Sequence, residues 1–146
     1  MNNPKPELAY SVGEQRAWYM YDFANSAFAS TVVTLFLGPY LTELAKSAAD
    51  AGGHIHPLGI EVDPRSYWSY LISLSVLSQV VFLPMLGAIA DYSPNKKRLL
   101  GIFSYVGAGA TIAMFALTDG MYLPGGLLFL IANLAFGCAV VIYNSF

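Results

Sequence analysis

Four long apolar runs, separated by shorter polar stretches, dominate the pattern of this 146-residue chain. The runs cover residues 18–44, 67–90, 99–117 and 123–146. Each has about the 17–25 residues that an α-helix needs to cross the hydrocarbon core of a bilayer. Because lipid offers the backbone no hydrogen-bond partners, runs of this length and composition form helices. The pattern predicts an all-α membrane protein with four transmembrane helices.

Composition supports this class. Hydrophobic residues make up 56% of the chain and charged residues 11%, which is too little charge to cover the surface of a soluble domain. Residues 1–15 are polar and predict a short N-terminal tail ahead of a partial transmembrane bundle at 16–146. The single cysteine, Cys138, excludes an intramolecular disulfide and is interpreted as a packing residue.

The cations lie unevenly between the two sides of the predicted bundle. One side carries five of them: Lys5, Arg16, Lys96, Lys97 and Arg98. The other side, in the long polar loop 46–66, carries Lys46 and Arg65. The positive-inside rule therefore places the N-terminus and the 91–98 loop in the cytoplasm.

The first run contains a polar stripe. Asp22, Asn25, Ser26 and Ser30 share one face at 3.6-residue periodicity. An acid in a membrane helix is costly and usually faces a bundle interior or a cavity, so this stripe is a candidate substrate or proton pathway. An interfacial acid near the helix start, hydrogen-bonded to a neighbour, is the alternative, and both stay open.

The second and fourth runs carry further polar side chains. Ser75, Ser78 and Gln79 can bond to a neighbouring helix, and this packing role is favoured over ligand binding. Asn133 and Asn144 are predicted to stack on one side of the last helix, where interhelical bonding and cavity lining both remain open. Gln79, Asn133 and Asn144 complete the list of pathway candidates.

The residues that catalysis requires do not assemble here. No nucleophile, base and oxyanion donors can meet, so an enzyme is not expected. No cofactor motif or basic patch for nucleic acid is present, and two alternate histidines, His54 and His56, in a Gly-rich loop do not predict a metal site.

The connection between the second and third runs concentrates charge in a short space. Gly87 and Asp91 are four residues apart and share a face of a continuing helix. Lys96, Lys97 and Arg98 follow a proline turn and fall at the start of the third helix, where the helix dipole opposes cations by about 0.3–1 kcal/mol each. Membrane orientation, anionic headgroups or pairing with Asp91 must outweigh that cost.

These segments resemble a known family. Gly87-x-x-Ala90-Asp91 with its turn and basic cluster resembles the loop between helices two and three of the major facilitator superfamily. The opening helix, Trp18-Tyr-Met-Tyr-Asp-Phe-Ala-Asn-Ser-Ala-Phe28, and the ending Tyr143-Asn-Ser-Phe146 resemble the vacuole-effluxer-like branch, bacterial relatives of the fungal autophagy-related amino-acid effluxer.

The resemblance implies a proton- or gradient-driven carrier of twelve helices, of which this chain would supply the first third. Gly87, Asp91 and the Lys96–Arg98 cluster would belong to a cytoplasmic gate, and Asp22 and Asn25 would face the central cavity. The expected partners are the lipid bilayer, a small-molecule solute and the missing C-terminal helices, in a bacterial cytoplasmic membrane. The chain ends inside an apolar run with no polar tail, which fits the front part of a longer protein.

Three functions are weighed. The first is a truncated secondary active transporter, a permease or exporter of amino acids or similar small solutes. The second is a complete four-helix carrier that works as a homodimer with Asp22 as its shared acid. The third is a membrane scaffold or assembly subunit whose polar residues only join helices.

Overall fold

The computed structural model describes residues 12–145 and confirms the all-α membrane class. Four helices are long and apolar enough to cross a membrane: Gln15–Ser47, Pro64–Tyr92, Lys96–Ala116 and Tyr122–Tyr143. Expectations about residues 1–11, Lys5 among them, and about Phe146 lie outside the described residues.

The chain divides into two compact units, Met1–Leu37 and Gly38–Phe146. In the first, α1 (Val12–Ala27) continues into the π-helix η1 (Phe28–Leu37). Thr34 Oγ1 donates to the carbonyl of Ala29, five residues back, at 2.9 Å. Ser30 lies in η1, whereas Asp22, Asn25 and Ser26 lie on α1. That these four residues share one face stays a prediction.

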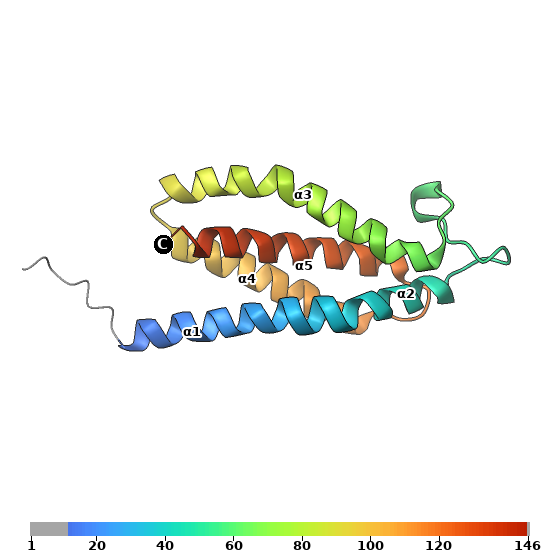
Figure 1. The fold of residues 1–146 in the computed structure, drawn as a ribbon, viewed down its shortest axis with the longest axis horizontal. Coiled ribbons are helices and arrows are strands. Elements are labelled where there is room, and N and C mark those ends of the chain that lie inside the picture. Colours follow the sequence, from blue (N-terminus) through green and yellow to red (C-terminus); the bar gives the residue numbers. More distant parts are fainter. Residues whose placement is uncertain (1–11, 146) are drawn as a thin grey trace, which may run out of the picture. The chain divides into compact units, whose positions relative to one another are not determined.

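The second unit is a helix bundle. It contains α2 (Gly38–Ser47), the short 3₁₀ turn η2 (Pro57–Gly59), α3 (Pro64–Tyr92), α4 (Lys96–Ala113), the 3₁₀ turn η3 (Met114–Ala116) and α5 (Tyr122–Tyr143). Within it, α5 runs beside both α3 and α4, and α2 packs against the start of α3 (Figure 1).

Local sequence explains where α3 begins and ends. Asp63 is its N-cap and accepts a hydrogen bond from the Arg65 amide at 2.8 Å, while Pro64 fills the first helical position, where no amide hydrogen is needed. Ser93 ends the helix in extended backbone, as expected directly before Pro94.

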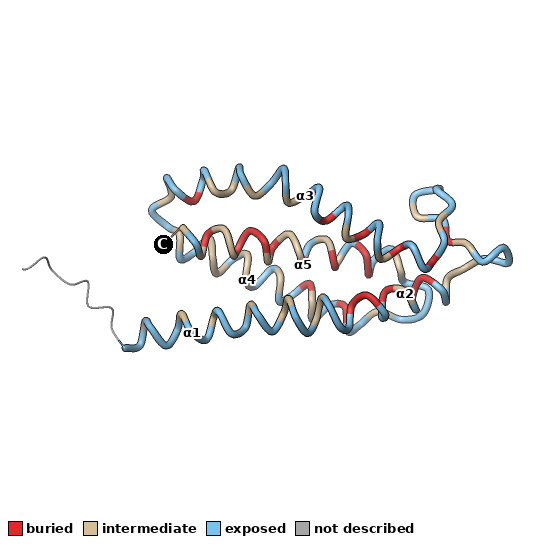
Figure 2. Tube along the Cα trace, viewed as in Figure 1, coloured by how far each residue is buried: buried red, intermediate tan, exposed pale blue. Residues whose placement is uncertain are grey.

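The core of this unit is built around α5. Half of the α5 span is buried within the protein, against 6% for α3 and 11% for α4 (Figure 2). The buried positions of α5 are mostly small, including Ala132, Ala135 and Ala139. A Cβ on Gly107 of α4 would stand 3.5 Å from that of Ala135, so small residues let these two helices approach closely.

Aromatic side chains close the end of the bundle where α3 and α5 begin. Tyr67 Oη donates to the Tyr122 carbonyl at 2.7 Å, and the two rings meet edge to face at 5.6 Å. Trp68 packs against the Phe129 ring with centroids 4.8 Å apart. Gly126 has no side chain where the Tyr67 hydroxyl lies, so this glycine makes the contact sterically feasible.

Candidate functional site

Three polar side chains meet between α3 and α5, well inside the two apolar spans. Asn133 Nδ2 donates to Ser75 Oγ, and Gln79 Nε2 donates to the backbone carbonyl of Asn133 at 3.3 Å. Ser75 is only 2% exposed. We call Ser75, Gln79 and Asn133 the α3–α5 polar contact. Because hydrocarbon offers no alternative partners, such bonds hold neighbouring transmembrane helices in one register.

Gly137 provides the space for this contact. It lies one turn after Asn133, and a Cβ there would come within 3.3 Å of the Gln79 amide carbon. The Asn133–Gly137 spacing marks this face of the last helix in the sequence, but only the fold identifies Gln79 as the group that occupies it. Each amide also carries an oxygen acceptor, so the contact combines helix joining with the capacity to meet a solute or proton donor.

Two predicted gate residues near the end of α3, Gly87 and Asp91, lie in different surroundings. Gly87 faces α5, since a Cβ on it would stand 3.6 Å from Val141 Cγ1. Asp91, one turn later, is exposed and lies in the last turn of α3. A negative charge there opposes the helix dipole, so local helix stability does not explain this acid.

Lys96 has a partner that its position in the sequence does not reveal. Its Nζ donates to the Ser145 carbonyl at 2.8 Å, just beyond the end of α5. Carbonyls at a helix C-terminus have no partner within the helix and favour a cation, so one charge that is unfavourable for α4 stabilises the end of α5 instead. Among the groups in residues 12–145 that could offset the dipole cost, Lys96 therefore uses α5 rather than Asp91.

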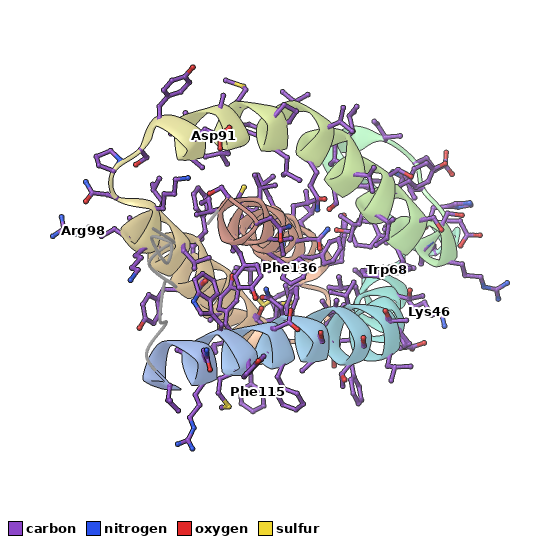
Figure 3. All side chains as sticks on the ribbon, turned by 60° about the vertical axis from the view of Figure 1, so that its left-hand side comes forward. Lys46, Trp68, Asp91, Arg98, Phe115 and Phe136 are labelled. Carbon is purple, nitrogen blue, oxygen red and sulfur yellow. The ribbon has the colours of Figure 1, made fainter. Side chains whose placement is uncertain are left out.

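The other two cations of the cluster remain on the outside. Lys97 and Arg98 are exposed in the first turn of α4. Arg98 extends away from the helices, while Asp91 lies on α3 (Figure 3). The described residues contain no ion pair between this cluster and Asp91.

The remaining pathway candidates are dispersed. Asp22, Asn25 and Ser26 lie on α1 in the first unit, with Asn25 half-buried and the other two exposed. Asn144 is the exposed C-cap of α5, and its backbone N–H donates to the Val140 carbonyl at 3.0 Å. Asn144 is exposed, while Asn133 is partly buried, and their stacking on one side of α5 stays a prediction.

Sequence reasoning undervalued Ser75 and did not find the Tyr67 or Lys96 contacts. The sequence signal for Ser75 is its spacing: it lies four residues before Gln79, on the same helix face. The Tyr67 contact is signalled by the Gly125-Gly126 pair, which is unusual in the first turns of an apolar helix. No group of three or more metal-binding side chains comes together in the part of the chain that the structure describes.

Four apolar spans that carry buried polar contacts define a multi-pass integral membrane protein. The chain belongs to the Atg22-like vacuole effluxer family. The model of this family, described as "Vacuole effluxer Atg22 like", matches residues 11–146. The predicted resemblance to this branch is thereby confirmed. This is a family of transporters and not of enzymes.

Curated relatives agree with this assignment. Autophagy-related protein 22 of Pyricularia oryzae is 28% identical over 91% of this chain, and that of Neurospora crassa is 27% identical over 91%. Autophagy-related protein 22-1 of Penicillium rubens is 39% identical over 63% of the chain. The chain spans 16–23% of the length of these relatives. All three are fungal, so they lend no support to the expected bacterial membrane. No solved structure matches the chain.

Proposed function

We propose that this chain forms part of a secondary active transporter that exports small solutes across a membrane, with amino acids as the first class to test. The family match over residues 11–146 carries the proposal, because that family is described as an effluxer. The α3–α5 polar contact and the acid on α1 support it, since polar groups inside membrane spans are costly and commonly mark solute or proton routes.

Within this proposal Asp22, Asn25 and Ser26 form the pathway side of α1, with Asp22 as the proton-binding group. Gln79 and Asn133 border the pathway and fix α3 to α5. We place the N-terminus and the α3–α4 loop on the cytoplasmic side, because Arg16 and the cluster Lys96–Arg98 outnumber the cations of the opposite loop.

The α3–α4 loop is the proposed gate. Asp91 and Arg98 are both exposed, and both sit at helix ends whose dipole disfavours their charge. Charged side chains that do not stabilise their own helix are suited to bind other parts of a carrier in one conformation and to release them in another. Lys96 would serve the gate indirectly, by holding the end of α5 against the start of α4.

Flux in proteoliposomes tests the proposal, using the carrier at the full length of its relatives. With a mixture of labelled amino acids on one side of the membrane, Asp22→Asn should lower flux by roughly tenfold or more if its charge is needed in the route. Asp119→Asn is the matched control, because Asp119 is exposed in the turn before α5 and should leave flux unchanged.

If Asp22→Asn inserts normally and keeps full flux, this acid has no role in transport; if the unmodified carrier shows no flux for any solute, the scaffold function is favoured. Asp91→Asn combined with Arg98→Gln should change flux without changing the helix content. If the amount of folded carrier falls instead, these residues serve stability and not a gate.

A further inference from the structure

The loop between α2 and α3, residues 48–63, folds on itself. Ile55 and Val62 form an antiparallel bridge with both backbone hydrogen bonds at 2.9 Å. The Ile55 side chain is 1% exposed, so the loop has a small buried anchor of its own. Side chains alternate along an extended segment, and His54 and His56 therefore both point to the side opposite Ile55.

The Asp50 carboxylate forms hydrogen bonds with residues 52–56 of this loop. Its Oδ1 accepts hydrogen bonds from the Gly52 amide at 2.9 Å and the His54 amide at 3.0 Å. Its Oδ2 meets His56 Nε2 at 2.8 Å. One carboxylate thus joins three points of the loop, two through the backbone and one through an imidazole.

Glu61 holds the second histidine. Its Oε1 lies 3.3 Å from His54 Nδ1, so His54 links the Asp50 turn to the returning strand. The charged groups on the adjoining helix ends are engaged elsewhere: Lys46 pairs with Glu43 at 2.6 Å, and Asp63 caps α3. Arg65, in the first turn of α3, is exposed and forms no ion pair with Asp50 or Glu61. Each histidine therefore has one carboxylate as its partner.

We propose that loop 48–63 is a pH-responsive clasp, in which protonation of His54 and His56 turns two hydrogen bonds to Glu61 and Asp50 into ion pairs and tightens the loop. A neutral imidazole can already donate to a carboxylate, but a charged one makes a shorter and stronger bond. Histidine changes its charge between pH 5 and 8, so the tightening falls in the physiological range.

Asp50 stays charged throughout this range. The hydrogen bond from His56, followed by the one from the His54 amide, lowers the pKa of Asp50 from 3.8 to about 2. Asp50 therefore remains an anionic partner for His56 between pH 7.5 and 5.0, and the proposed response is an increase in order as the pH falls. This inference stands apart from the proposed transport function.

Hydrogen–deuterium exchange of the whole chain in phosphatidylcholine nanodiscs tests the clasp. After correction for intrinsic exchange, amides of residues 50–62 should be protected roughly threefold to tenfold more at pH 5.0 than at pH 7.5, as expected for two exposed pairs of modest strength. The double variant His54→Gln/His56→Gln keeps a neutral donor at each position and should show equal protection at both pH values.

Asp119→Asn, in the connection before α5, is the control and should keep the wild-type response. Protection of the α5 amides reports whether each variant is folded, and His56→Gln alone should retain about half of the response on a logarithmic scale. Equal protection of the wild-type loop at both pH values would overturn the proposal, and so would a full response in the double glutamine variant.

Discussion

Replacing Gly126 by alanine tests the aromatic junction at the start of α5. An alanine Cβ would overlap the Tyr67 hydroxyl and stand 3.0 Å from Leu71 Cδ2. Tyr67 cannot keep its hydrogen bond to the Tyr122 carbonyl and also make room for this methyl group. We expect Gly126→Ala to push the ring away and open the contact between α3 and α5.

Three contributions determine the size of the effect. Inserting a methyl group into a packed site costs about 1–3 kcal/mol. Losing the Tyr67–Tyr122 hydrogen bond costs about 0.5–1.5 kcal/mol more. Replacing a helical glycine by alanine returns about 0.8–1 kcal/mol. The free energy of unfolding should therefore fall by about 0.5–3.7 kcal/mol in total, with about 2 kcal/mol at the centre of the range.

The assay is reversible unfolding of the chain in detergent micelles, followed by circular dichroism. Gly101→Ala is the matched control, because Gly101 is also in a helix but nothing lies within 4 Å of its added Cβ. That variant should be as stable as the wild type or slightly more stable.

A second substitution separates overlap from a general effect of the methyl group. Tyr67→Phe removes the overlapping oxygen, so Gly126→Ala/Tyr67→Phe should be more stable than the sum of the two single effects predicts, by about 1 kcal/mol. If the two effects add, or if Gly126→Ala is as harmless as Gly101→Ala, the packing described for this junction is wrong.

Three further predictions follow from other contacts. Asp50 has a lowered pKa, so its contribution to loop order is complete above pH 3.8 and should be lost as the pH falls to about 2, which exchange measured between pH 4.5 and 2 would detect. Lys96→Met should destabilise the end of α5 by about 0.5–1.5 kcal/mol, whereas Arg98→Met should change stability by less than about 0.5 kcal/mol, both measured by unfolding. A double-mutant cycle of Ser75→Ala and Asn133→Ala should give a coupling of about 0.6–1.7 kcal/mol, and a value near zero would contradict a bond between them.

The number and class of the helices follow from the sequence, because hydropathy and the thickness of the bilayer act on each segment alone. The 67–90 run predicts α3 in this way, and no partner needs to be known. Contacts between segments do not follow. Lys96 and Ser145 are 49 residues apart. Nothing in the sequence near Lys96 indicates that its ammonium group donates a hydrogen bond to the carbonyl just beyond α5.

Two local features could not be predicted from the sequence, for different reasons. The first is the π-helix that the residues from Phe28 to Leu37 adopt, which has no simple sequence signature. The second is the order of the loop around His54 and His56. Its order depends on side-chain-to-backbone bonds of Asp50, which hydrophobic periodicity does not report.

The central position of α5 has a consequence for the order of synthesis. The chain leaves the ribosome from its N-terminus, so α3 and α4 enter the membrane before α5 exists. During that interval Ser75 and Gln79 lack Asn133, and Lys96 lacks the carbonyl that it later caps. The second unit can therefore reach its final packing only after residue 145 has left the translocation channel. Until then, Ser75 and Gln79 on α3 lack the partners that they have in the folded bundle.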